Sequence, residues 1–252
     1  MRAAVAGAVT MGLLAGPSLP AAAIADGEQV PKGRYGFSVK LTMTGIPTAD
    51  GGRRNSACSG ALVAPRWVIT AGHCFRDADN VRVDHPVADR TTATIGRTDL
   101  TDTSRGHELE IVAVRQSPTA DVSLAQLAEP VRDVRPIRLG HTPPEIGSVV
   151  RVTGYGSTTS TNPAPVTWLR TGRLSVVALS DSVTGLTGYA PARDTTPCPY
   201  DSGGAYFLER EHRSPALVAV VSNGPSCPHT STENGARTDN ITGWIRDVIS
   251  AR

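Results

Sequence analysis

The stretch Pro197-Cys198-Pro199-Tyr200-Asp201-Ser202-Gly203-Gly204 places a serine between an acidic residue and two glycines. Small residues beside a serine leave room for its hydroxyl group and for the backbone amides around it, as a loop that carries a nucleophile requires. A serine hydroxyl is a weak nucleophile at neutral pH, so it needs a base within hydrogen-bonding distance. The stretch therefore predicts a hydrolase, with a histidine elsewhere in the chain as the base.

A candidate base and a candidate acid both precede this serine. His73 lies in Thr70-Ala71-Gly72-His73-Cys74, directly after the apolar run Trp67-Val68-Ile69, and Asp121 opens the strand-like segment Asp121-Val122-Ser123-Leu124-Ala125-Gln126-Leu127. A carboxylate fixes the tautomer of an imidazole and stabilises the imidazolium that forms when it takes a proton. The order His73, Asp121, Ser202 therefore predicts a catalytic triad.

These three segments resemble the trypsin/chymotrypsin-like serine peptidase family, whose usual forms are TAAHC, DIALL and GDSGGP. The resemblance covers nearly the whole chain after residue 23. It implies an all-β fold of two packed six-stranded antiparallel β-barrels with a C-terminal α-helix. It also implies an endopeptidase that hydrolyses protein or peptide substrates through an acyl-enzyme. The basic residues are nearly all arginine, which suggests the secreted type of actinobacteria.

The apolar pattern of the chain points to the same fold class. Short segments rich in aliphatic residues recur between clusters of Gly, Pro, Asn, Asp and Ser, which is typical of all-β proteins. One helix is expected near the C-terminus, where Trp244, Ile245, Val248 and Ile249 share a face. The expected strands are 37–41, 61–63, 67–70, 111–114, 149–152, 174–179 and 216–221.

Residues 1–23 have the character of a secretory signal peptide. A single charge at Arg2 precedes an apolar stretch that ends in Ala21-Ala22-Ala23. The stretch is interrupted by Gly and Pro and is shorter than the roughly 20 residues that span a membrane. About 229 residues (252 minus 23) would remain, more than the roughly 100–200 of one domain. We therefore expect a secreted, extracellular protein with one barrel in 24–137 and another in 138–252.

Charge and composition limit the expected partners. The formal net charge is +2 and the basic residues are spread singly, so neither nucleic acid nor a membrane surface is expected as a partner. We expect a monomer without cofactor or metal that meets its peptide substrate and, as a further candidate partner, a proteinaceous inhibitor.

Four cysteines in an exported chain suggest two disulfide bonds, although the sequence alone permits three pairings. A four-cysteine metal site is disfavoured because the close Cys-x-x-Cys spacing is missing. The family resemblance selects Cys58 with Cys74 and Cys198 with Cys227. The first bond would tether the histidine loop, and the second would hold the serine loop.

The resemblance also implies an activation device and an oxyanion hole. Cleavage after Ala23 would leave Ile24-Ala25-Asp26-Gly27 as the new terminus, which is similar to the family's IVGG. The Ile24 ammonium would then pair with Asp201 and order the loop that carries the backbone amides of Tyr200 and Ser202. Tyr200 stands where the family has glycine, and its side chain restricts backbone angles that glycine tolerates. This departure predicts low activity.

The resemblance further places a specificity pocket beside Ser202. Thr196 would form its base, with Pro197 beside it and Ser222, Gly224 and Gly235 along its walls. No carboxylate occupies this base, so a neutral substrate side chain is expected rather than Arg or Lys. Ser222 would also donate a hydrogen bond to the triad acid.

The sequence leaves two other functions open. A weakly active or inactive homologue could act as an extracellular binding module, which the tyrosine at position 200 makes more credible. An esterase of the α/β-hydrolase fold is disfavoured, because Tyr200 occupies the first glycine position of the GxSxG elbow and no histidine follows Asp239 or Asp247.

Overall fold

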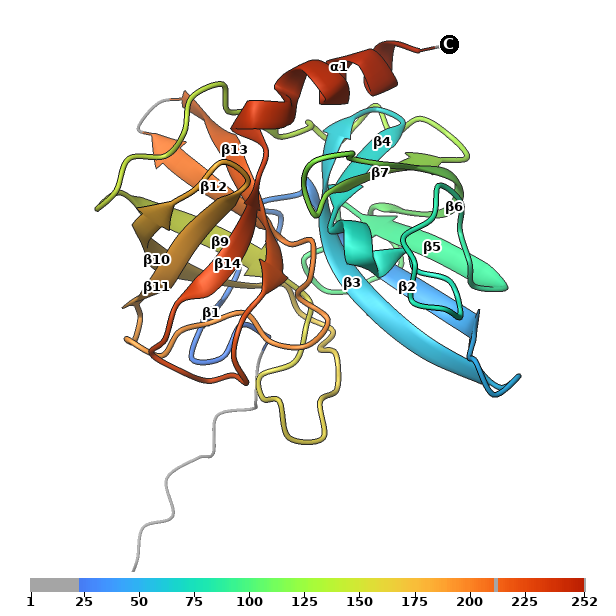
Figure 1. Ribbon diagram of the computed structural model, residues 1–252, viewed down its shortest axis with the longest axis horizontal. Coiled ribbons are helices and arrows are strands. Elements are labelled where there is room, and N and C mark those ends of the chain that lie inside the picture. The colour runs from blue at the N-terminus through green and yellow to red at the C-terminus, as the bar shows by residue number, and fades with distance from the viewer. Residues whose placement is uncertain (1–22, 211–212, 252) are drawn as a thin grey trace, which may run out of the picture.

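The computed structural model describes residues 23–210 and 213–251, so the predicted signal peptide lies outside the described residues except for Ala23. The strands of the described chain form two barrels side by side (Figure 1), and all their pairings are antiparallel except that of β8 with β13. None of the helices in these ranges is long and apolar enough to cross a bilayer.

The first barrel closes through its last strand pairing with its first, in the order β2-β3-β4-β7-β6-β5. Alternate residues of a strand point to opposite faces, so Val39, Leu41 and Met43 all reach the interior, where none is more than 2% exposed. The strands are β2 (Ser38–Pro47), β3 (Arg53–Ala64), β4 (Trp67–Thr70), β5 (Arg90–Ile95), β6 (His107–Gln116) and β7 (Ser123–Leu127).

The second barrel closes because β9 pairs with both β10 and β12. Two short strands, β1 (Glu28–Gln29) and β8 (Arg138–Leu139), extend its sheet by pairing with β10 and β13. The six barrel strands are β9 (Val149–Gly154), β10 (Arg170–Leu179), β11 (Val183–Ala190), β12 (Ala205–Arg210), β13 (Arg213–Asn223) and β14 (Glu233–Arg237). The expected fold of two six-stranded antiparallel barrels is confirmed, and it rules out the α/β-hydrolase alternative.

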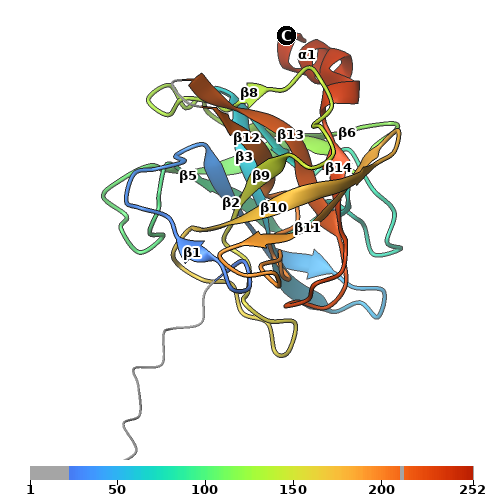
Figure 2. The same cartoon turned by 90° about the vertical axis from the view of Figure 1, so that its left-hand side faces the viewer.

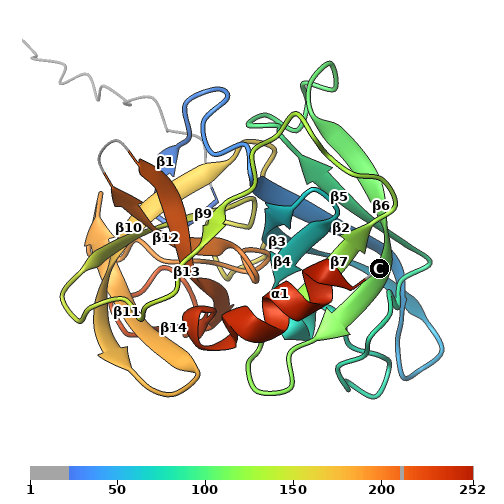
Figure 3. The ribbon, with the colours of Figure 1, turned by 90° about the horizontal axis from the view of Figure 1, so that it is seen from above.

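Each end of the described chain crosses toward the opposite barrel. The N-terminal strand β1 pairs with β10 of the second barrel (Figure 2). The C-terminal helix α1 (Thr242–Ser250) begins at the second barrel and extends over β4 and β7 of the first (Figure 3). Its Ile245 is fully buried, and Trp244 and Val248 pack against the same core. The boundaries 24–137 and 138–252 stay a prediction.

The barrels meet through packed aromatic rings. Phe37, just before β2, lies edge-on to Phe207 of β12 with ring centroids 5.3 Å apart, and Tyr35 lies 5.2 Å from the same ring. Edge-to-face pairs of this kind favour one arrangement of the rings. This contact fixes the two barrels relative to each other, which matters because the predicted site residues come from both.

Candidate active site

His73 lies in a short 3₁₀ helix, η1 (Gly72–Cys74), directly after β4. The Cys58–Cys74 disulfide ties this helix to β3. Thr70, the last residue of β4, donates a hydrogen bond from its hydroxyl to the carbonyl of Ser59 at 2.7 Å. The backbone that presents His73 is therefore held on both sides.

Asp121 precedes β7, and the pairing of β7 with β4 brings it to His73. Ser123 is the register partner of Thr70, so the residues just outside these positions meet at the same end of the sheet. The Asp121 carboxylate accepts a hydrogen bond from the His73 amide at 2.9 Å, and its other oxygen lies 2.8 Å from His73 Nδ1. The carboxylate thus holds both the backbone and the ring of His73.

The charge of Asp121 is stabilised by these contacts and by one from the second barrel. Ser222 of β13 donates its hydroxyl to Asp121 Oδ2 at 2.7 Å, as the family resemblance implies. Burial alone would raise the pKa of Asp121, but the hydrogen bonds and charge of His73 and the Ser222 bond outweigh it and lower that pKa to about 2. The carboxylate is therefore ionised throughout the neutral range.

Ser202 lies in the loop between β11 and β12, across the barrel interface from His73. Both side chains border one cavity of about 290 Å³, together with Tyr200. In the described part of the chain, no hydrogen bond joins the His73 ring to the Ser202 hydroxyl. Contacts of this kind commonly tighten only in the complex with substrate. Ser202 and the His73–Asp121 pair therefore approach one cavity from the two sides of the interface.

The backbone amides of Tyr200 and Ser202 donate to no acceptor among the described residues, so both are free to bind an oxyanion. Tyr200 adopts a φ of 74°, in the left-handed region that costs a non-glycine residue about 1–2 kcal/mol. Its carbonyl accepts a hydrogen bond from Ser59 Oγ at 3.2 Å. At Gly203 a Cβ atom would overlap Ser59 and Thr70, so this position requires glycine.

Asp201 belongs to the same loop, and its side chain is fully buried. Its carboxylate accepts hydrogen bonds from the amides of Gly156 at 2.8 Å, Cys198 at 3.0 Å and Ile24 at 3.4 Å. Burial raises the pKa of Asp201 to about 7 in spite of these bonds. The Ile24 nitrogen thus lies at Asp201 even though the peptide bond to Ala23, itself buried, is intact.

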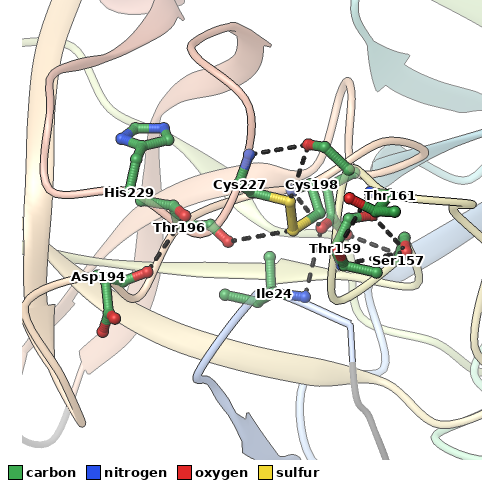
Figure 4. The surroundings of a disulfide bond; sticks show 12 residues. Ile24, Ser157, Thr159, Thr161, Asp194, Thr196, Cys198, Cys227 and His229 are labelled. Carbon is green, nitrogen blue, oxygen red and sulfur yellow. Dashed lines mark hydrogen bonds between the residues drawn. A yellow bond between two sulfur atoms is a disulfide. The ribbon is translucent and has the colours of Figure 1, made fainter.

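The Cys198–Cys227 disulfide holds the Ser202 loop from the side. It joins the residue four before Ser202 to the segment that follows β13. Figure 4 shows Ile24 beneath the two sulfur atoms. Both disulfides have the pairing that the resemblance implies, and each stabilises the fold by about 3 kcal/mol if it acts by restricting the unfolded chain.

Lys40 is a site residue that the sequence patterns did not predict. It lies on β2, is 5% exposed, and donates from Nζ to the Tyr155 carbonyl at 3.1 Å. The ammonium also lies 5.7 Å from the centroid of the Tyr200 ring. Burial lowers the pKa of Lys40 to about 8, and the charge of Asp201 opposes this shift. The signal in the sequence is that Lys40 is the one charged residue of its strand.

A second cavity of about 370 Å³ lies on the other side of Ser202. Pro197, Ser222 and Gly224 line it, as expected for the specificity pocket, and Glu233, which was not predicted, lines it too. Among the described residues, Thr196 and Gly235 are not part of the lining, and their role in a specificity pocket stays a prediction.

Thr196 and Gly235 are missing from the lining because both are buried behind it. Thr196 is fully buried, and its hydroxyl donates to the carbonyl of Asp194 at 3.2 Å. Gly235 lies further along β14, and a Cβ atom there would contact Ala219, Leu186 and Tyr206. Both positions therefore lie behind the cavity wall.

Comparison with known proteins decides the family. The family model described as Trypsin matches residues 24–245. The chain belongs to the trypsin family. It is 28% identical over 214 residues to thrombin-like enzyme acutin of Deinagkistrodon acutus, covering 77% of this chain and 85% of the relative. It is 26% identical over 210 residues to beta-fibrinogenase-like of Daboia siamensis, covering 77% and 78%.

A human relative matches more of this trypsin-family chain but less of its own length. Serine protease 56 of Homo sapiens is 27% identical over 257 residues, which cover 90% of this chain and 39% of the relative. At these identities, the chain is a distant relative of these proteins within the family.

A larger cavity, of about 1050 Å³, lies away from the predicted triad. It is bordered by segments around Tyr35, Arg105, Pro136 and Glu209, and no triad residue lines it. Among residues 23–210 and 213–251, no group of three or more His, Cys, Asp or Glu side chains is placed to hold a metal. The two smaller cavities that share Ser202 are therefore the candidate sites of reaction.

Proposed function

We propose that the chain is a serine endopeptidase in which Ser202 is the nucleophile, His73 the general base and Asp121 the residue that orients His73. The observation that carries the proposal is the continuous hydrogen-bonded chain from Ser222 through Asp121 to the His73 ring, at a cavity that Ser202 also borders. Family membership supports the same reaction class.

In this mechanism, Ser202 Oγ attacks the carbonyl carbon of the scissile peptide bond while His73 Nε2 takes the hydroxyl proton. The amides of Tyr200 and Ser202 donate to the oxygen that becomes negative. His73 then gives its proton to the leaving amine, the peptide bond breaks, and an acyl-enzyme remains. Water attacks the acyl-enzyme with the same proton transfers in the same order, which releases the acid and restores Ser202. Ionised Asp121 stabilises the imidazolium in both steps.

Activation is proposed to follow removal of residues 1–23. The new Ile24 ammonium would take the place of the Ile24 amide nitrogen, which now donates a hydrogen bond to the Asp201 carboxylate. An ammonium next to a buried carboxylate offsets the cost of burying its charge, which an amide does only in part. Secretion is part of this proposal and is supported by two disulfides, which persist in oxidising compartments. The actinobacterial type, the monomeric state and the inhibitor stay predictions.

The expectation of a neutral substrate side chain rested on Thr196 as the pocket base with Pro197 beside it, and it did not include Glu233. Glu233 lines the same cavity as Pro197, whereas Thr196 lies behind its wall. The substrate preference therefore depends on the charge state and the partners of Glu233.

Labelling with a fluorophosphonate tests the proposed function. Covalent capture of Ser202 in the chain that begins at Ile24, lost in H73A and retained in the exposed-histidine control H85A, supports a peptidase. Hydrolysis of a mixed peptide library by the same protein would show endopeptidase activity. Absence of both capture and hydrolysis overturns the proposal in favour of the binding module.

A further inference from the structure

Glu233 places a carboxylate in the wall of the cavity beside Ser202, and a role for it in substrate selection rests on the proposed function. It begins β14 and is 2% exposed. A Cβ atom added at Gly224 would overlap its Oε2 atom, so the carboxylate lies directly against the Gly224 backbone on the facing side of the cavity. The absence of a side chain at position 224 is what leaves it room.

Glu233 contacts its neighbour His229 through one carboxylate oxygen only. His229 Nε2 lies 2.7 Å from Glu233 Oε1, while His229 Nδ1 is buried and has no partner among the described residues. The contact of His229 with the carboxylate therefore runs through Nε2 and Oε1 alone. Figure 4 shows the His229 ring turned away from the disulfide.

The second oxygen of Glu233 has no donor of its own. No described residue donates a hydrogen bond to Oε2, whereas Oε1 has His229. Burial raises the pKa of Glu233 above its ordinary value, since a carboxylate that has lost water and gained one partner is poorly stabilised. A cation entering the cavity would supply the missing interaction.

The rest of the cavity gives no competing charge. Among the described residues that line it, Glu233 is the one charged side chain, and the others are apolar, hydroxyl-bearing, amide or glycine. An acidic substrate side chain would be repelled, and a neutral one would leave Glu233 Oε2 without a partner. A positively charged side chain is the class that this lining stabilises.

We propose that Glu233 makes this cavity select arginine or lysine in the residue before the scissile bond, from the cavity wall rather than from its base. The expectation of a neutral side chain is thereby replaced, because it considered only the base. Glu233 is a specificity residue here: it touches the substrate side chain and takes no part in the transfer of protons at Ser202.

The experiment compares two peptide substrates that differ only in arginine against citrulline before the scissile bond, since citrulline has the shape of arginine without its charge. We expect kcat/KM for the arginine peptide to be at least about tenfold higher, equivalent to about 1.4 kcal/mol. In E233Q the ratio should fall to within about twofold, because a buried amide offers no charge to the cation. E129Q, at an exposed glutamate, should keep the ratio of the unaltered chain.

A ratio near one in the unaltered chain, or a ratio that E233Q leaves unchanged, overturns the proposal. A purely structural role of Glu233 would lower both rates together and leave the ratio intact. If E233Q does not fold, the comparison on the unaltered chain decides.

A binding measurement separates failure of this inference from failure of the proposed function. If Ser202 proves unreactive, calorimetry with benzamidine, a cation, and benzamide, its neutral analogue, probes the cavity directly. Benzamidine binding at least about tenfold more tightly supports the role of Glu233. Equal or undetectable binding of both overturns it.

Discussion

The ammonium of Lys40, which lies over the Tyr200 ring, and the carboxylate of Asp201 are both buried, and their opposite charges attract each other. Lys40 comes from the first barrel and Asp201 from the second, so the interaction crosses the interface. Burial disfavours the charged form of each group, and each partner offsets part of that cost for the other.

Replacing Lys40 by methionine tests this interaction. The pKa of Asp201 is about 7 while Ile24 offers only an amide nitrogen, and an ammonium at Ile24 lowers it. In either chain the attraction of Lys40 lowers this pKa. Without it that pKa rises, so Asp201 loses its charge at a higher pH as the solution is acidified. The acidic limb of the activity profile should therefore move to higher pH in K40M. K32M removes the chain's other lysine, which is exposed, and should leave the limb in place. Identical limbs in the two variants would contradict the prediction.

Extending the chain before Ile24 should abolish activity without unfolding the barrels. A methionine or tag turns the ammonium into an amide, and loss of one partner of a buried ion pair costs about 3–5 kcal/mol. Peptide hydrolysis and circular dichroism of the chain that begins at Ile24, compared with the extended one, measure both effects. The same tag at the C-terminus is the control. Normal turnover by the extended chain would count against the role of Ile24.

Two substitutions at Tyr200 separate its backbone from its side chain. Tyr200→Gly keeps the amide and tolerates a positive φ, so kcat should stay within about threefold. Tyr200→Val puts a β-branched residue in that conformation, and a loop that relaxes away from it loses an oxyanion donor, at about 10²–10³ in kcat. Thermal unfolding of both variants checks that they fold. An increase of kcat by about tenfold or more in Tyr200→Gly would instead mean that the tyrosine impairs the oxyanion hole.

Asp121 should contribute stability that depends on pH. Its pKa is about 2 in the folded chain, against 3.8 without perturbation. A lowered folded-state pKa gives stability that is present above about pH 4 and lost as the pH falls toward about 2, here about 2 kcal/mol. Urea titrations measure the free energy of unfolding at about pH 6 and about pH 2. Its decrease between these pH values should be about 2 kcal/mol smaller in D121N than in the unaltered chain. D79N, at an exposed aspartate, should behave as the unaltered chain.

The features predicted most reliably from the sequence are those that depend on one short segment of the chain. The segments around His73, Asp121 and Ser202 can each be recognised from their own neighbouring residues. The pairing of β4 with β7 depends only on the alternating residues of two strands. The seven expected strands all fall on observed ones, while β5, β11, β12 and β14 were not foreseen.

The cavity wall was harder to predict because it depends on register. Counting from the family pattern chose Gly235, whereas the pairing of Asn223 with Asn234 brings Glu233 to the cavity instead. A shift of this kind arises in the loop between Cys227 and β14, whose length no local pattern reveals. Lys40 was missed for a related reason: its neighbours Tyr155, Tyr200 and Asp201 are all more than a hundred residues away along the chain.

The crossed ends have a mechanical consequence. Strand β1 belongs to the sheet of the second barrel, and α1 reaches over the first. A protease that cuts the connection near Arg135 would therefore leave two fragments that still bind each other through these elements. The proposed catalytic crevice would then survive a break in the polypeptide between its two halves.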